Sequence, residues 1–293
     1  MTDLLLKVFL PSSLAIIMLG MGMSLTIHDF TRVFRQPKAI IIGLFNQIFI
    51  LPIIAFLLAI LFHLDTTMAV GLIVLASCPG GPTSNIISQI CNGNLALSVT
   101  LTAVGSFTSV ISTQLVTSFA LTYFNTHTGT AIELPVLDTM FQIMMITMLP
   151  ICIGMFIHAY KTNFALRMLK PMKIASTIIF ILIFIGIVAT NFNTIGQALK
   201  KVGIVTLLLN ISIIGSGFLL AKIFNLGSKN AISIGVDGGI QNATLGIVIA
   251  TSILNNIEMA IPTAAYSIWM YSTGGVLMWC FGKRNRKTTS LRK

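Results

Sequence analysis

Long runs of apolar residues, separated by short polar segments, fill almost the whole chain. Most runs hold about 20 residues, the length that an α-helix needs to cross the hydrocarbon core of a bilayer. They predict nine membrane-spanning helices, at about 8–27, 38–62, 67–91, 94–123, 136–158, 172–191, 202–223, 229–254 and 261–281. No connection is long enough for a soluble domain. We therefore predict one all-α polytopic membrane domain over residues 1–293.

The composition agrees with a membrane protein built of helices. Of the 293 residues, 55% are hydrophobic and only 9% are charged, whereas soluble domains carry about 25% charged residues. A β-barrel would show short segments of alternating hydrophobicity instead of long apolar runs. We interpret the first run as a retained helix rather than a cleaved signal peptide.

Basic residues gather on one side of the predicted membrane topology. The net charge is +11, but the charges lie in short loops and at the C-terminus, which argues against a nucleic-acid-binding face. If the N-terminus is outside, only Lys7, Lys200 and Lys201 of the 18 lysines and arginines lie outside. The positive-inside rule then predicts an external N-terminus and a cytoplasmic C-terminus.

One acidic residue, Asp237, falls at membrane depth in the eighth predicted span, while the other acids lie in or next to loops. A buried intramembrane acid costs about 2.5–3.5 kcal/mol on insertion scales, so it marks a candidate functional site. Gly238 and Gly239 follow it, and then the amides Gln241 and Asn242. These glycines predict a weaker helix at this point.

The third predicted span is interrupted more strongly, by Pro79, Gly80, Gly81 and Pro82 in mid-span. Proline removes a backbone donor and blocks the preceding helical turn. The third and eighth spans run in opposite directions in the predicted topology, which is typical of an inverted repeat made of spans 1–4 and 5–9. Paired interrupted spans of this kind are a sequence indication of a transporter site.

Unwound backbone at membrane depth offers carbonyl oxygens to a hard cation, and the N-termini of half-helices favour an anion. Polar side chains lie near the predicted interruptions. Ser98 and Thr102 share one face of the fourth span, which Ser106 and Ser109 extend, and Gln47 and Asn210 lie in the second and seventh spans. The competing interpretation is structural, because serine and threonine in membrane helices commonly bond to their own helix carbonyls.

Several motifs resemble the bile acid:sodium symporter (BASS) family, in particular its bacterial members in a nine-helix form. These motifs are Cys78-Pro79-Gly80-Gly81, Ser84-Asn85, Gly93 to Ser98, Gly20 to Leu25, Gln47 with Pro52, and Gln241-Asn242. The resemblance covers nearly the whole chain in order. It implies two discontinuous crossing helices, a core domain (about 38–123 and 202–281) and a panel domain (about 8–27 and 136–191).

The resemblance also implies two sodium ions and no organic cofactor. The first sodium site would comprise Ser84, Asn85, Ser98, Thr102 and Asp237. The second would comprise Gln47, Asp237, Gly238, Ile240 and Gln241. Pro82, Thr83 and Asn242 would meet the substrate. Two positions depart from the family pattern, because Asp237 stands where glutamate is common and Pro82 where bacterial members often have threonine.

The resulting hypothesis is a sodium-coupled symporter of an organic anion, working by alternating access in a bacterial inner membrane. Its partners would be lipid and a small anion, such as a bile-acid-like molecule, pantoate or a keto acid, without nucleic acid. Oligomeric state stays open.

Two alternatives remain open. One is proton-coupled transport or cation/proton exchange, with a desolvated Asp237 carrying the proton. The other is a membrane sensor or channel. An enzyme is disfavoured, because no nucleophile–base pair or metal-ligand cluster lies at membrane depth.

Overall fold

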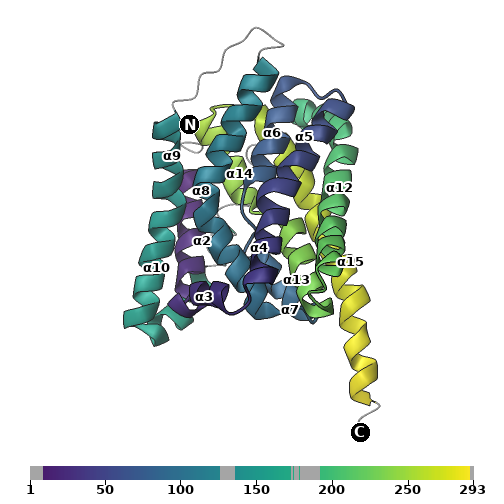
Figure 1. Cartoon of the computed structure of the whole chain (residues 1–293). Helices are drawn as coiled ribbons and strands as arrows, with labels where there is room; N and C mark the ends of the chain where they lie inside the picture. Colours follow the sequence, from purple (N-terminus) through teal and green to yellow (C-terminus); the bar gives the residue numbers. More distant parts are fainter. Residues whose placement is uncertain (1–8, 126–135, 173, 175–177, 179–191, 291–293) are drawn as a thin grey trace.

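The chain forms a bundle of helices that run between two ends of the molecule (Figure 1). The computed structural model describes residues 9–125, 136–172, 174, 178 and 192–290. Among these residues the one β-type pairing is an isolated antiparallel bridge between Gly80 and Gln241. The prediction of an all-helical chain is therefore confirmed for the part that the structure describes.

Six stretches of the chain form the long or nearly continuous helices. Three of them are composite: α2 (Leu10–Ser24) with α3 (Ile27–Thr31) and η2 (Arg32–Phe34), α4 (Pro37–Phe45) with η3 (Asn46–Ile50) and α5 (Leu51–Leu61), and α9 (Val136–Ile143) with η4 (Met144–Met148) and α10 (Leu149–Tyr160). The other three are the single helices α8 (Leu95–Asn125), α12 (Phe192–Ile223) and α15 (Ile261–Ser290). The short η6 (Glu258–Ala260) precedes α15. Segments η3 and η4 are π-helical turns inside their helices.

Four more α-helices and a π-helical turn form two broken crossings. The first crossing consists of α6 (Thr66–Ser77) and α7 (Thr83–Ile90). The second consists of α13 (Ser228–Gly239) and α14 (Ala243–Val248), which continues as the π-helical turn η5 (Ile249–Ile253). Both crossings match predicted spans, 67–91 and 229–254.

The length and composition of the helices support an integral membrane protein. Within the described residues four helices are long and apolar enough to cross a bilayer, and a fifth counts if α2 and the α3–η2 segment, bent by 76°, form one span. The predicted total of nine stays a prediction. Most of the predicted span 172–191 lies outside the described residues.

The outer surface of the bundle is apolar, as a lipid-facing surface must be. On α4, η3 and α5 every fourth side chain is a large apolar group that is 45–69% exposed. This stripe consists of Ile41, Phe45, Phe49, Ile53, Leu57 and Leu61. Such a surface is suited to contact with lipid rather than water. In lipid, polar side chains and backbone groups must form their hydrogen bonds inside the protein.

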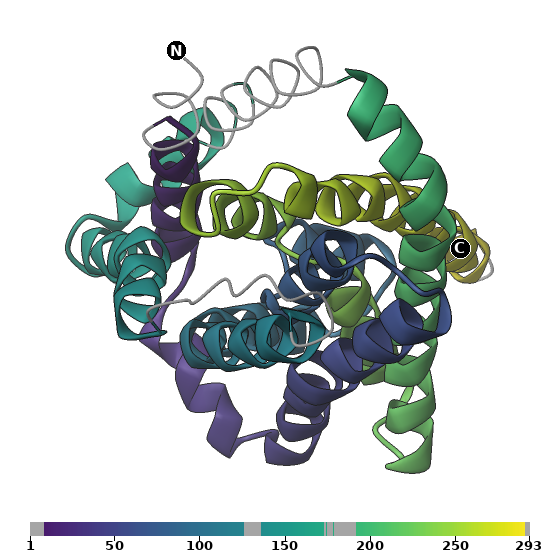
Figure 2. The same cartoon turned by 90° about the horizontal axis from the view of Figure 1, so that it is seen from above.

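The helices α2 and α10 pack together through small residues. Gly22 of α2 and Gly154 of α10 leave no room for a side chain. A Cβ added to Gly22 would lie 2.2 Å from the Ile151 carbonyl oxygen, and one added to Gly154 would lie 2.3 Å from the Leu19 carbonyl oxygen. Viewed from above, this pair lies on one side of the molecule and α12 on the other (Figure 2). Close backbone approach at glycine is a common way for helices to associate in membranes.

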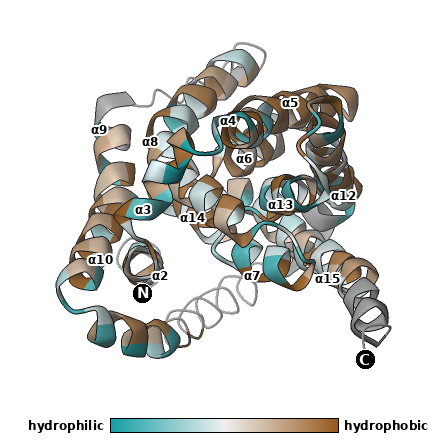
Figure 3. Ribbon diagram, turned by 60° about the horizontal axis from the view of Figure 1, so that its bottom comes forward, coloured by the Kyte–Doolittle hydropathy of each residue, from teal (hydrophilic) through white to brown (hydrophobic). Residues whose placement is uncertain are grey.

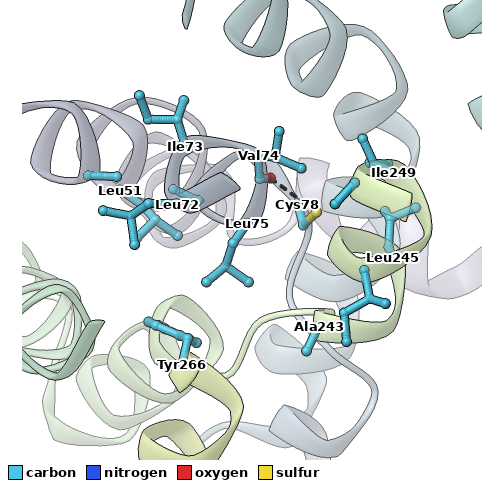
Figure 4. Close-up of a cluster of buried hydrophobic side chains, with 14 of the residues drawn as sticks. Leu51, Leu72, Ile73, Val74, Leu75, Cys78, Ala243, Leu245, Ile249 and Tyr266 are labelled. Atoms are coloured by element: carbon cyan, nitrogen blue, oxygen red, sulfur yellow. Dashed lines mark hydrogen bonds between the residues drawn. The ribbon is translucent and has the colours of Figure 1, made fainter. Parts of the chain in front are cut away.

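The apolar core is continuous around the first half of the first crossing and the second half of the second crossing. Leu72, Ile73 and Leu75 of α6 are buried, as are Leu245 of α14 and Ile249 of η5. Figure 4 shows these side chains in one buried cluster. The core therefore holds α6 and α14 in position, and the candidate site depends on these two half-helices.

Candidate functional site

The first break separates α6 from α7 and follows directly from its sequence. Helix α6 ends at Ser77, and Cys78 is extended, with φ −68° and ψ 156°. Pro79 and Pro82 then prevent continuation, because neither has an N–H group to donate. Pro82 stands at the N-cap of α7, where a missing donor costs little.

The second break separates α13 from α14 without any proline. Ile240 is extended after Gly239, with φ −107° and ψ 90°. The new helix is capped by Asn242, whose Oδ1 accepts a hydrogen bond from the Leu245 N–H at 3.1 Å. The interruption predicted from Gly238 and Gly239 is thus confirmed, with an asparagine cap as its second cause.

The two breaks lie against each other and are joined by backbone hydrogen bonds. The Gly81 N–H donates to the Ile240 carbonyl at 2.8 Å, and the Asn242 N–H donates to the Pro79 carbonyl at 2.9 Å. Together with the Gly80–Gln241 bridge, these bonds form a minimal antiparallel pairing at the crossing. Four half-helix ends therefore converge at one buried point.

Asp237 lies in the last turn of α13 beside this crossing and is only 2% exposed. Its Oδ1 accepts hydrogen bonds from Ser84 Oγ of α7 at 2.7 Å and from Thr102 Oγ1 of α8 at 2.9 Å. The carboxylate also lies on Gly80, where an added Cβ would be 3.0 Å from Oδ1 and 3.1 Å from Oδ2. Three helices and one glycine thus surround a single carboxyl group.

Asn85 extends this cluster across α7 and α8. Its Oδ1 accepts hydrogen bonds from Ser98 Oγ at 2.9 Å and from Thr102 Oγ1 at 3.3 Å. The five residues predicted for a first cation site, Ser84, Asn85, Ser98, Thr102 and Asp237, therefore form one connected group of side-chain oxygens. Oxygen ligands of this kind suit a hard cation.

The second predicted set is characterised by amides without partners. Gln47, on η3, is 3% exposed, and neither its Oε1 nor its Nε2 has a hydrogen-bond partner. The buried Gln241 Oε1 also has none. Buried polar atoms normally form hydrogen bonds, and leaving such an atom without a partner costs about 1–3 kcal/mol. These amide oxygens are therefore available to a ligand.

The backbone carbonyls of the second set are less open than predicted. Gly238 O accepts from Gln241 Nε2 at 2.6 Å, and Ile240 O accepts from the Gly81 N–H. A carbonyl oxygen has two lone pairs, so each keeps one for another ligand. The breaks thus expose fewer free carbonyls than unwound backbone alone predicts, because Gln241 satisfies one within its own crossing and Gly81 satisfies the other across the junction.

The residues predicted to meet a substrate surround the starts of α7 and α14. Pro82 and Thr83 are half-buried at the start of α7. Asn242 is 5% exposed, and its Oδ1 serves as the cap of α14. Both helix N-termini point toward the crossing, where their partial positive charge favours an anion.

Some polar residues of the sequence pattern do not join the site. Ser106 Oγ donates to the Thr102 carbonyl at 2.7 Å, and Ser109 Oγ donates to the Ser106 carbonyl at 2.9 Å. Both serines thus bond to their own helix, as the structural interpretation predicted.

Other site residues were not found from the sequence. Asn46 is fully buried and accepts a hydrogen bond from Ser216 Oγ at 2.7 Å, and its amide beside Gln47 in an apolar span was a usable signal. Tyr266 Oη donates to the Gly239 carbonyl at 3.0 Å. The same carbonyl accepts from Asn210 Nδ2 at 2.8 Å, and Asn210 was among the polar residues named from the sequence. Nothing in the sequence distinguishes Tyr266 from an ordinary packing aromatic.

Two interrupted helices that cross at a buried carboxylate, inside an apolar bundle, define the class of secondary membrane transporters. The family model described as the Sodium Bile acid symporter family matches residues 11–198. The chain belongs to this family, whose members are transporters and not enzymes.

Three relatives illustrate the similarity. The chain is 32% identical over 267 residues to the probable sodium/metabolite cotransporter BASS1, chloroplastic, of Arabidopsis thaliana, covering 90% of this chain and 64% of the relative. It is 30% identical over 275 residues to the uncharacterized sodium-dependent transporter YocS of Bacillus subtilis, covering 94% and 83%. It is 28% identical over 285 residues to the ileal sodium/bile acid cotransporter of Cricetulus griseus, covering 93% and 80%.

Proposed function

We propose that this protein is a sodium-coupled symporter of an organic anion. The observation that carries the proposal is the Asp237 carboxylate, held at the crossing by hydroxyl groups from α7 and α8. A negative charge at membrane depth, surrounded by oxygen ligands, is costly unless it binds a cation. The names of the relatives, which include sodium-dependent transporters and sodium cotransporters, support sodium as that cation.

Two sodium ions are proposed at the crossing. The first would bind the connected oxygens of Ser84, Asn85, Ser98, Thr102 and Asp237. The second would bind Asp237 with Gln47, Gln241 and the remaining lone pairs of the Gly238 and Ile240 carbonyls. The unpaired buried amides of Gln47 and Gln241 support this second site. No organic cofactor is proposed.

The anion is proposed to meet Pro82, Thr83 and Asn242, at the starts of α7 and α14. A carboxylate or sulfonate there would interact with free N–H groups and with the partial positive charge of two helix ends. Small carboxylates such as pantoate or a keto acid are favoured over a bile acid. Bound sodium would neutralise Asp237 and so remove the repulsion between two anions.

The proposed transport cycle is alternating access between two domains. The core would contain the segments 38–123 and 202–281, and the panel the segments 8–27 and 136–191. Tight packing of α2 on α10 through Gly22 and Gly154 supports a panel that moves as one body. We place the protein in a bacterial inner membrane, with the C-terminus in the cytoplasm.

The test is the binding of ²²Na⁺ to the purified full chain, followed by uptake of radiolabelled anions into proteoliposomes. Asp237→Asn should abolish sodium binding and sodium-driven uptake, because the amide lacks the charge that compensates the cation. Asp138→Asn is the matched control, since Asp138 is exposed on α9. Unchanged sodium binding in the Asp237→Asn variant would contradict the site. Uptake driven by a proton gradient without sodium would favour the proton-coupled alternative instead.

A further inference from the structure

A second pair of hydroxyls lies one helical turn away from Asp237, between α7 and α13. Ser88 follows Ser84 by four residues, and Ser233 precedes Asp237 by four, so both pairs lie on the same helix faces. Ser88 Oγ and Ser233 Oγ are 2.8 Å apart, and both side chains are fully buried. The two antiparallel half-helices thus repeat, about 6 Å farther along, the polar contact that they make at Asp237.

The polar contacts continue from this serine pair to the end of the molecule. Ser233 Oγ donates to the Asn94 carbonyl at 3.0 Å. Asn94 Nδ2 donates to Asn230 Oδ1 at 2.8 Å and to Gln36 Oε1 at 3.2 Å. The exposure of the side chains increases along this path. Asn94 and Asn230 are half-buried, and Gln36 is exposed. Figure 3 shows hydrophilic residues on α7 and α13 at this end.

The other two half-helices meet in a different way. Buried apolar side chains lie where α6 and α14 approach each other: Val74, Leu75, Ala243 and Leu245 (Figure 4). The buried Ser77 at the end of α6 donates to the Val74 carbonyl of its own helix, at 2.7 Å. Cys78 Sγ donates only to the Val74 carbonyl of its own helix, at 3.3 Å. The serine pair one helical turn from Asp237 therefore lies between α7 and α13 and not between α6 and α14.

We propose that the Ser88 and Ser233 hydroxyls, with the Asn94 carbonyl, form a transient site for a monovalent cation. It would lie on a release path that leads from Asp237 between α7 and α13 to Asn230. This inference rests on the proposed sodium transport and adds a second, weaker cation-binding site to it. Ser233 Oγ contacts both other oxygens, at 2.8 and 3.0 Å, and no fixed charge is among them. Such a site suits brief binding, because the ion is stabilised only weakly.

Gly93 limits the serine pair on one side and supports this assignment. A Cβ on Gly93 would lie 2.6 Å from Ser88 Oγ and 2.7 Å from Ser233 Oγ. The backbone itself therefore forms the wall beside the two hydroxyls. The path is narrow, so removal of its oxygens should slow passage without changing the primary site.

The first experiment removes both hydroxyls in the full chain, as Ser88→Ala with Ser233→Ala. The Asn94 carbonyl keeps the Ser98 N–H as a donor, so the variant leaves no buried group unpaired. Release of bound ²²Na⁺ is measured by rapid filtration after dilution into sodium-free buffer. We expect release about tenfold slower, with equilibrium sodium affinity within twofold of the unmodified protein. Ser109→Ala is the control, because its hydroxyl bonds only within α8.

The second experiment introduces a charged side chain at Asn230, the end of the path farthest from Asp237, where the fold is expected to tolerate it. Asn230 is half-buried and lies about 10 Å along α13 from Asp237. A cation at this position should repel the passing ion, so Asn230→Lys should slow release roughly fivefold, whereas Asn230→Asp should not slow it. Asn256→Lys, half-buried at the opposite end of the second crossing, should leave release unchanged.

The outcomes separate this inference from the proposed function. Wild-type release in both the double alanine and the Asn230→Lys variants would overturn the path while leaving sodium binding at Asp237 intact. A large loss of equilibrium affinity in the double variant would overturn it too, because the serines would then belong to the primary site. Failure of the unmodified protein to bind sodium would overturn the proposed function and the path together.

Discussion

A single oxygen atom organises the chemistry at the crossing. Asp237 Oδ1 receives hydroxyl groups from residues that lie 153 and 135 positions away in the chain. This aspartate stands where the family commonly has glutamate, and its side chain is one methylene shorter. It reaches Ser84 and Thr102 at 2.7 and 2.9 Å, because Gly80 lets the second crossing approach closely. The carboxyl group of Asp237 and the missing side chain of Gly80 thus match in space.

Gly80→Ala tests this match. The added Cβ would press on both carboxylate oxygens, at 3.0 and 3.1 Å, and would displace the carboxylate from its hydroxyl partners. We expect sodium affinity to fall at least about tenfold, which corresponds to about 1.4 kcal/mol. The measurement is equilibrium ²²Na⁺ binding to the purified protein.

The control for this variant is Gly215→Ala on α12, where an added Cβ meets nothing within 4 Å. That change should leave sodium affinity unaltered and should stabilise the helix by about 0.5–1 kcal/mol. If Gly80→Ala binds sodium as tightly as the Gly215 variant, the close approach has no role in the site.

Broken helices create the difficulty of unsatisfied carbonyls at their ends, and here other helices resolve it. The Gly239 carbonyl, at the end of α13, accepts from Asn210 Nδ2 of α12 and Tyr266 Oη of α15. Thr273 Oγ1 in turn donates to Asn210 Oδ1 at 2.7 Å. Two continuous helices therefore hold the interrupted end in position.

The sequence predicted both interruptions because proline, glycine and asparagine act locally through dihedral angles and missing donors. It also identified the polar side chains Ser84, Thr102 and Gln47 from their depth in apolar spans. It did not predict the donor Tyr266, the acceptor Asn46 or the Ser88–Ser233 pair, because these contacts depend on which helix faces meet. The π-helical turn at Gln47 was likewise not predicted from a single residue pattern.

Tyr266→Phe tests the support of the broken end. The Gly239 carbonyl would lose one of two donors in a buried place, so the free energy of unfolding should fall by about 1 kcal/mol. Thermal and denaturant unfolding in detergent measure the change. Tyr271→Phe on the same helix is the control, because Tyr271 is 54% exposed and should have little effect. Equal stability of the two variants would contradict a supporting role.

At the scale of the whole molecule, three loops that the topology assigns to the cytoplasm come together at one end. Gln36 before α4, Asn94 before α8 and Asn230 in α13 are joined by hydrogen bonds. The Asn94 N–H donates to the Lys229 carbonyl at 3.1 Å. The basic residues of these loops therefore share one face, as the positive-inside rule requires.

Reporter fusions test the orientation of that face. A fluorescent protein fused to the C-terminus should be fluorescent in a bacterial host, and alkaline phosphatase fused there should be inactive, because the C-terminus is predicted to be cytoplasmic. A phosphatase inserted in the loop between η5 and η6, at the opposite end, should be active. An active C-terminal phosphatase would reverse the predicted orientation and would make the serine path lead outward.

The pairing of Gly81 with Ile240 and of Asn242 with Pro79 uses main-chain atoms alone. These bonds need no side chain as donor or acceptor, but the close approach leaves no room for one at Gly80 or Gly81, where an added Cβ would lie 3.0 Å from Asp237 Oδ1 or 2.9 Å from the Gln241 carbonyl oxygen. A substitution beside the junction, at a residue other than these two glycines, would therefore leave its two main-chain hydrogen bonds in place.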